Sequence, residues 1–162
     1  MLKKHYKINV DRTITNWLKK KGWFLFNHQI DLLEQSKLGF DIVLNSPTGT
    51  GKTLAGFLPS IEDLVQKSTK SLHTLYISPL KSLTYDIERN LKKPINEMNL
   101  NISFGTRTGD TKFSLKKKQL MSPPNILFTT IESFVLLMAE KKKNLFNNLK
   151  FIVVDEVHSI VN

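Results

Sequence analysis

The stretch "NSPTGTGKT", Asn45–Thr53, lies between a short apolar run, "DIVL" from Asp41, and an amphipathic segment that begins at Lys52. Its two glycines allow backbone conformations that residues with a Cβ rarely adopt. In such a turn successive N–H groups point inward, and the following helix adds the free N–H groups of its first turn. The stretch is therefore interpreted as a phosphate-binding loop, although Ser46 stands where the usual pattern opens with glycine.

Short apolar runs rich in β-branched or aromatic residues recur along the chain, as is typical of parallel strands buried on both faces. These runs are "DIVLNS" from Asp41, "HTLYISP" from His73, "NISFGTRT" from Asn101, "NILFTTI" from Asn125 and "FIVVDE" from Phe151. Between them, apolar residues at three- and four-residue steps predict helices. These helical segments are Leu54 to Val65, Leu83 to Leu91 and Ile131 to Met138. The alternation predicts an α/β domain with a mostly parallel sheet.

Two further helices are expected before the first strand. One covers Thr13 to Lys20, opened near Asp11 and closed at Gly22. The other covers "HQIDLLEQSKL", with Asn27 as its cap and Gly39 as its end. Within the helix after the phosphate loop, Pro59 is expected to introduce a kink.

The composition of the chain limits the classes of function that it could have. The 162 residues suffice for one domain, carry a net charge of +10 and include no cysteine, which excludes disulfides and thiolate metal sites. No apolar run is long enough for a membrane span and no signal peptide is visible, so a cytoplasmic protein without a membrane partner is expected. The charge favours a polyanionic partner. Lysine runs at 19–21, 116–118 and 141–143 are more typical of solvated helix faces than of binding patches, so charge alone supports a nucleic-acid partner only weakly.

A second chemical motif ends the last apolar run, "FIVVDEVH". Asp155, at the end of the predicted strand, is suited to hold Mg²⁺, and Glu156 to orient and deprotonate a water as general base. In the phosphate loop, Lys52 would reach the β- and γ-phosphates and the Thr53 hydroxyl would ligate Mg²⁺. Together the two motifs predict hydrolysis of a nucleoside triphosphate.

The motifs "SPTGTGKT" and "DEVH" resemble motifs I and II of superfamily 2 DEAD/DEAH-type helicases. The succession "FLP", "LYISPLKSLTYDIERNL", "RTGDT" and "SPPNILFTTIESFVLLM" resembles the large helicase-related (Lhr-type) DNA helicases. The opening "NWLKKKGWFLFNHQIDLL" further resembles their ligase-associated bacterial branch. This resemblance implies a RecA-like P-loop NTPase domain, with helices on both sides of the sheet. Residues 1–40 would form N-terminal helices with a Q-motif-like region, and residues 41–162 the P-loop core.

The resemblance also implies ATP and Mg²⁺ as cofactors and assigns site residues. The nucleotide would be bound by Gln29, which matches the adenine-recognising glutamine, and by Thr48, Gly49, Thr50, Gly51, Lys52 and Thr53. Lys52 and Glu156 would be catalytic, and Thr53 and Asp155 would ligate the metal. His158 would couple the nucleotide and nucleic-acid sites. The nucleic-acid contacts would come from Pro79, Leu80, Lys81, Arg107, Thr108, Gly109, Thr129, Thr130, Glu132 and Ser133.

Asn162 follows Asp155 by only seven residues. The resemblance implies a further strand with a Ser-Ala-Thr-type motif, inserted between the phosphate-loop strand and the "FIVVDE" strand, and a second RecA-like domain that carries arginine fingers. We therefore expect an incomplete first RecA-like domain, truncated after the motif II strand, with a gap in its sheet. Such a chain alone would bind nucleotide weakly, have negligible turnover and be poorly stable.

The leading hypothesis is the nucleotide-binding part of an ATP-dependent DNA helicase or translocase moving on single-stranded DNA. Its partners would be single-stranded DNA or a duplex with a single-stranded tail, the missing C-terminal RecA-like domain, and DNA-repair proteins such as a ligase. Two alternatives stay open: a P-loop kinase or other NTPase that does not act on nucleic acid, and a non-catalytic nucleic-acid-binding remnant. The motifs "PLKSL" and "RTGDT" favour the helicase, because a kinase leaves them unexplained.

Overall fold

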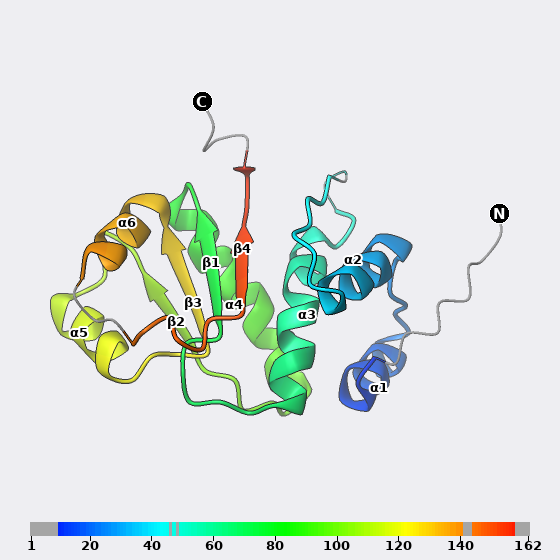
Figure 1. Ribbon diagram of the computed structural model, residues 1–162. Coiled ribbons are helices and arrows are strands. Elements are labelled where there is room, and N and C mark those ends of the chain that lie inside the picture. The colour runs from blue at the N-terminus through cyan, green and yellow to red at the C-terminus, as the bar shows by residue number, and fades with distance from the viewer. Residues whose placement is uncertain (1–9, 46, 48, 141–143, 158–162) are drawn as a thin grey trace. The chain divides into compact units, whose positions relative to one another are not determined.

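The computed structural model describes residues 10–45, 47, 49–140 and 144–157. By its internal contacts the chain consists of two compact units, Met1–Lys67 and Ser68–Asn162. Figure 1 shows the helices of the first unit and the sheet of the second. Within the described part of the chain, no helix has the length and apolar character needed to cross a bilayer.

The first unit is helical. Its helices are α1 (Arg12–Lys21), α2 (Asn27–Lys37) and α3 (Lys52–Gln66). The start of α1 is confirmed, because the Asp11 carboxylate accepts a hydrogen bond of 2.7 Å from the Thr13 N–H. Its predicted end is confirmed as well, since Gly22 takes up the left-handed conformation with a φ of 68°.

The ends of α2 differ in detail from expectation. Asn27 is the first residue of α2 rather than its cap. The Phe26 N–H is instead satisfied by Gln29, whose side-chain Oε1 accepts its hydrogen bond at 3.0 Å. The helix ends at Lys37, close to the predicted stop at Gly39, which has a φ of 83°. α3 continues through Pro59, so this proline does not end the helix.

The strand expected from Asp41 is not formed. Residues 41–45 are irregular, and Val43 is 93% exposed where a strand buried on both faces was predicted. A strand needs a neighbouring strand to satisfy its N–H and C=O groups. Residues 41–45 pair with none of the four strands of the described sheet, so the prediction of a strand before the phosphate loop is wrong for this structure.

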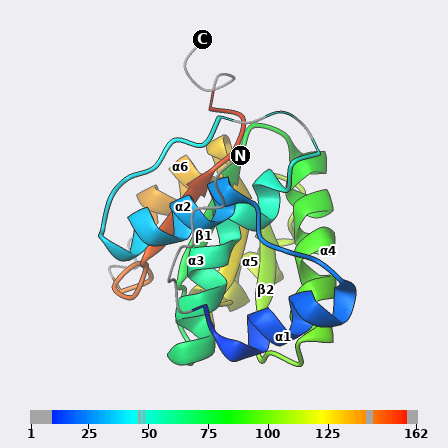
Figure 2. The same cartoon turned by 90° about the vertical axis from the view of Figure 1, so that its right-hand side faces the viewer.

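The second unit is a parallel sheet with helices on both faces. Its strands are β1 (Thr74–Ser78), β2 (Phe104–Arg107), β3 (Ile126–Thr130) and β4 (Phe151–Val154). Its helices are α4 (Lys81–Glu97), α5 (Phe113–Met121) and α6 (Ile131–Ala139). The strand order is β2-β3-β1-β4, and all pairs are parallel. α4 lies on one face of the sheet and α6 on the other, as Figures 1 and 2 show.

The core explains the apolar runs in the sequence. Every residue of β1 and β3 is buried, as expected for central parallel strands covered on both faces. On the α6 face of the sheet, Leu75, Ile77 and Leu127 form one buried cluster with Leu137 of α6. β4 lies at the edge of the described sheet. It is less buried than β1 and β3, as the 56% exposure of Ile152 shows.

Four of the five predicted strands and the helices around Leu83 to Leu91 and Ile131 to Met138 are confirmed. α5 was not predicted. Its apolar residues Phe113, Leu115 and Met121 are exposed, Leu120 is half-buried against the core, and its fully buried residue is Gln119. A helix that buries no apolar stripe leaves no periodic signal in the sequence.

Candidate functional site

In the first unit, the phosphate loop leads directly into α3. Gly49 and Gly51 have φ values of 79° and 77°, left-handed conformations that favour glycine. The helix begins at Lys52, which is exposed, and its first hydrogen bond runs from the Ala55 N–H to the Gly51 carbonyl at 3.0 Å. No described side chain caps this end of α3, so an anion would use the first N–H groups of the helix.

The predicted phosphate ligands Gly49, Thr50, Gly51, Lys52 and Thr53 therefore lie together in one turn and the start of one helix. The Thr50 hydroxyl steadies the turn by donating to the Pro47 carbonyl at 2.8 Å. Thr48, a further predicted ligand, and Ser46 lie outside the described residues.

Gln29 ties α2 to the phosphate loop. Its side chain is buried, and its Nε2 donates to the Gly51 carbonyl at 3.2 Å while its Oε1 accepts from Phe26. A Cβ on residue 51 would lie 2.7 Å from that Nε2, so a larger residue would displace the Gln29 side chain, and the φ of 77° favours glycine in its own right. These two hydrogen bonds use one N–H and one lone pair of the carboxamide, which has a second of each. Recognition of adenine by Gln29 stays a prediction.

In the second unit, β4 brings Asp155 to the carboxyl edge of the sheet. Its N–H donates to the Ile77 carbonyl of β1 at 3.0 Å. Both oxygens of its carboxylate are held: the Tyr76 hydroxyl donates to Oδ2 at 2.8 Å, and the Glu156 N–H donates to Oδ1 at 2.9 Å. Burial, followed by the hydrogen bond to Asp155, raises the pKa of Tyr76 far above its ordinary value, so the hydroxyl keeps its proton and acts as a donor.

Glu156, the predicted general base, is exposed and has a φ of 50°. Left-handed backbone is uncommon for a residue other than glycine and costs about 1 kcal/mol or more. Such conformations persist where surrounding structure holds them and are concentrated at functional sites. The observed backbone therefore supports a functional role for the turn that follows β4.

The donor chemistry fits Mg²⁺ bound together with a nucleotide. Among the described residues, no three acidic or histidine side chains cluster as a dedicated metal cage. Mg²⁺ commonly takes one or two protein oxygens and completes its shell with waters and phosphate oxygens. The Asp155 carboxylate and the Thr53 hydroxyl are oxygen donors of that kind.

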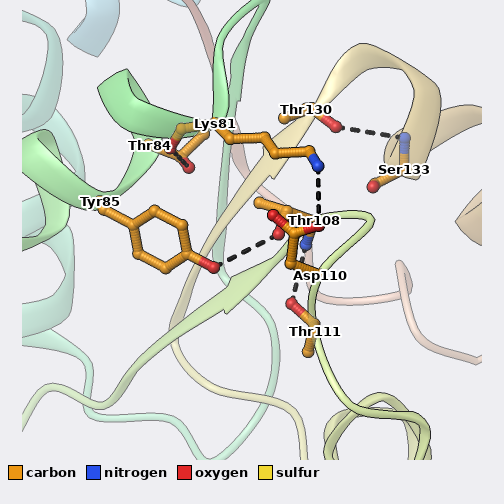
Figure 3. Close-up of polar contacts among 8 residues, drawn as sticks. All are labelled: Lys81, Thr84, Tyr85, Thr108, Asp110, Thr111, Thr130 and Ser133. Atoms are coloured by element: carbon orange, nitrogen blue, oxygen red, sulfur yellow. Dashed lines mark hydrogen bonds and ion pairs between the residues drawn. The ribbon is translucent and has the colours of Figure 1, made fainter.

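Polar residues also gather where β1, β2 and β3 end, as Figure 3 shows. Lys81, the first residue of α4, pairs through Nζ with Asp110 Oδ1 at 2.8 Å, and this hydrogen bond raises the pKa of Lys81. The Thr108 N–H donates to the Thr111 hydroxyl at 2.9 Å, which closes the loop after β2. Carboxyl ends of parallel strands meet at one edge, the usual ligand-binding edge of such sheets.

The helix α6 begins at the same edge. The Thr130 hydroxyl caps it by accepting a hydrogen bond of 3.4 Å from the Ser133 N–H. Both residues are buried, whereas Glu132 between them is exposed. Ile131 is the first residue of the helix.

The structure corrects the expectation for Arg107. Its side chain is only 4% exposed, pairs with Glu140, and donates to the Lys116 carbonyl at 3.0 Å. A buried guanidinium with these partners fastens the end of β2 to α5 and to the end of α6, and is not available to a phosphate. Thr129 has a similar internal role, because its buried hydroxyl donates to the Arg107 carbonyl at 2.8 Å.

The remaining predicted nucleic-acid contacts divide by exposure. Lys81, Leu80, Gly109 and Glu132 are exposed and Pro79 is half-buried, whereas the Thr108 side chain is buried. Contacts to a phosphate backbone would therefore come mainly from the Lys81 ammonium and from main-chain N–H groups. His158, the predicted coupling residue, lies outside the described residues.

Two residues of this unit were missed from the sequence. Tyr76 sits inside the run "LYIS" and was treated as an ordinary core residue of a strand. Asp110 belongs to "RTGDT" but was not assigned a role. A tyrosine within a strand that is buried throughout is the available signal for the first, since a buried hydroxyl requires a partner. The second had no signal, because its partner Lys81 is distant in sequence.

Comparison with known proteins places this geometry in a family. Residues 26–162 match the family model described as DEAD/DEAH box helicase. The chain is 37% identical over 161 residues to the ATP-dependent helicase Lhr-Core of Sulfolobus acidocaldarius, covering 92% of this chain and 18% of that protein. It is 32% identical over 145 residues to a Lhr helicase/probable uracil glycosylase of Mycolicibacterium smegmatis, covering 82% of this chain and 10% of that protein.

Solved structures agree. The structure of Mycobacterium smegmatis helicase Lhr bound to ssDNA and AMP-PNP has a TM-score of 0.85 and 30% identity, covering 93% of this chain and 21% of that one. The helicase MrfA bound to DNA and AMPPNP has a TM-score of 0.81 and 34% identity, with the same coverage. The RecA-like α/β fold and the Lhr-type resemblance are thereby confirmed. The chain spans a fifth or less of the length of the curated relatives described above.

Proposed function

Because the chain belongs to the DEAD/DEAH box helicase family, we propose that it is the nucleotide-binding part of an ATP-dependent DNA helicase or translocase that moves on single-stranded DNA. The observation that supports this most directly is the carboxyl edge of the sheet, where the exposed Lys81 opens α4 beside the loop after β2. The DNA in the Lhr and MrfA structures supports DNA as the partner.

The proposed nucleotide chemistry uses two segments, the phosphate loop before α3 and the residues that follow β4. Lys52 and the first N–H groups of α3 bind the β- and γ-phosphates, and Gln29 and the glycines hold the loop in shape. The Thr53 hydroxyl and the Asp155 carboxylate would each supply an oxygen ligand to Mg²⁺, which would neutralise charge on the phosphates. Glu156 accepts a proton from the attacking water, because its carboxylate follows the metal ligand directly and is exposed.

The nucleic-acid chemistry is electrostatic and independent of base sequence. Lys81 neutralises a backbone phosphate, and N–H groups of the loop at residues 108–111 fix the strand's position. A second RecA-like domain supplies the arginine fingers that complete the ATP site, and opening and closing of the two domains moves the strand. A DNA-repair ligase as partner is supported by the resemblance of the opening residues alone.

Lys81→Ala in the full-length protein should weaken binding of a fluorescent single-stranded oligonucleotide. The loss of one phosphate contact should also reduce the slope of log affinity against log salt by about 0.7. Asp110→Asn should do the opposite and tighten binding about two- to fivefold at low salt, because it frees Lys81 from an exposed ion pair and removes a negative charge. Fluorescence anisotropy at several salt concentrations measures both effects.

Asp86→Asn is the matched control for Asp110→Asn. Asp86 also forms an exposed ion pair, with Arg89 at 2.9 Å on α4, and the substitution changes the net charge equally. It should raise affinity much less than Asp110→Asn at the same salt concentration. Equal effects of the two substitutions would show that net charge alone, and not the Lys81 site, determines binding.

A further inference from the structure

The buried tyrosine of β1 makes a contact that the helicase assignment does not explain. Tyr76 is 1% exposed, and its ring lies 5.5 Å from that of Phe128 on the neighbouring strand β3. Phenylalanine would fill this position equally well by packing alone. The hydroxyl instead reaches across to β4 and donates to Asp155 Oδ2 at 2.8 Å. A hydrogen bond to an ionised carboxylate is about twice as strong as one between neutral groups.

This contact completes the fixation of the Asp155 carboxylate. The main chain of the residue is already held to β1, since its N–H donates to the Ile77 carbonyl. The Glu156 N–H occupies Oδ1, in a turn whose φ of 50° is itself unusual. Without the Tyr76 hydroxyl, Oδ2 would have no donor among these contacts, and the carboxylate could rotate about its last torsion. With it, the outward lone pairs of both oxygens have a defined direction.

We propose that Tyr76 is a positioning residue, which orients the Asp155 carboxylate toward the metal of a bound nucleotide and does not itself touch the metal or the substrate. The inference rests on the proposed function, because it takes Asp155 to be a metal ligand. Hydrogen bonds from the surroundings of a ligand orient it, and their loss commonly reduces metal affinity about 10- to 100-fold. The effect should therefore appear in the Mg²⁺ requirement and not in the fold.

Tyr76→Phe in the full-length protein tests this. Binding of a fluorescent adenine nucleotide is titrated with Mg²⁺ and is also measured in EDTA, and thermal melting is followed without ligand. We expect the Mg²⁺ concentration at half-maximal binding to rise about tenfold. Binding in EDTA should stay near its wild-type value, because the ring and its packing are kept, and the melting temperature should fall only by the few degrees expected for one lost hydrogen bond.

Phe128→Leu is the packing control, since it changes the ring that faces Tyr76 but leaves the hydroxyl in place. It should lower the melting temperature without moving the Mg²⁺ midpoint. In an Asp155→Asn background, Tyr76→Phe should add no further change to the Mg²⁺ dependence.

A Tyr76→Phe variant with the wild-type Mg²⁺ midpoint would overturn the proposal. So would a variant that melts well below wild type and loses nucleotide binding in EDTA as well, because the hydroxyl would then have a structural role. Failure of the wild-type protein to show any Mg²⁺-dependent nucleotide binding is a different result, which would contradict the proposed function itself.

Discussion

Lys52→Ala should abolish measurable nucleotide binding by the full-length protein. Lys52 is the first residue of α3, directly after a glycine in the left-handed conformation, and its exposed ammonium is the only charged side chain in the segment Asn45–Thr53. Removing one partner of a hydrogen-bonded charge pair costs several kcal/mol, so the affinity for ATP should fall by about 100-fold or more. Equilibrium binding of a fluorescent ATP analogue with Mg²⁺ measures the loss.

Lys67→Ala is the matched control, because Lys67 follows the last residue of the same helix and is also exposed. The two substitutions remove the same charge from opposite ends of α3. Only the substitution at the start of the helix should affect binding. Similar losses from both variants would mean that the anion is not bound at the start of α3.

Glu156→Gln should keep nucleotide binding and remove hydrolysis. Glutamine keeps the shape of the side chain and the backbone N–H that donates to Asp155, but cannot accept a proton from water. A general base contributes about 10²- to 10⁴-fold to rate, and kcat should fall by about that factor. Steady-state ATPase rates and equilibrium binding on the same preparation separate the two effects.

Glu97→Gln makes the same chemical change at the exposed end of α4 and should leave both quantities near wild type. A Glu156→Gln protein that hydrolyses ATP at the wild-type rate would show that another group activates the water.

The sequence predicted the parts of the fold that have strong periodic or apolar signals. β1 and β3 are buried throughout, and their runs were identified with their boundaries nearly correct. Residues 41–45 have the same apolar character yet form no strand, because strand formation depends on a paired neighbour and not on the run itself. α5 was not predicted for the opposite reason. It forms a helix without burying an apolar stripe that the sequence would reveal.

The site shows a similar division between residue type and residue environment. An unusual backbone conformation was predicted for Gly49 and Gly51, because a phosphate-binding turn needs one. Their positive φ values agree with this prediction. Arg107 was predicted as a nucleic-acid contact from the resemblance of its motif, but its burial and its pairing with Glu140 depend on residues far along the chain. The contact between Tyr76 and Asp155 is equally non-local, and only the pairing of β1 with β4 brings it about.

We propose that ATP hydrolysis by this protein serves movement on DNA. It is tested most directly by the steady-state ATPase rate of the full-length protein, measured with Mg²⁺ in the presence and absence of single-stranded DNA. We predict strong stimulation by single-stranded DNA, reduced at subsaturating DNA in Lys81→Ala and absent in Lys52→Ala. An ATPase rate that is the same with and without DNA would contradict the account.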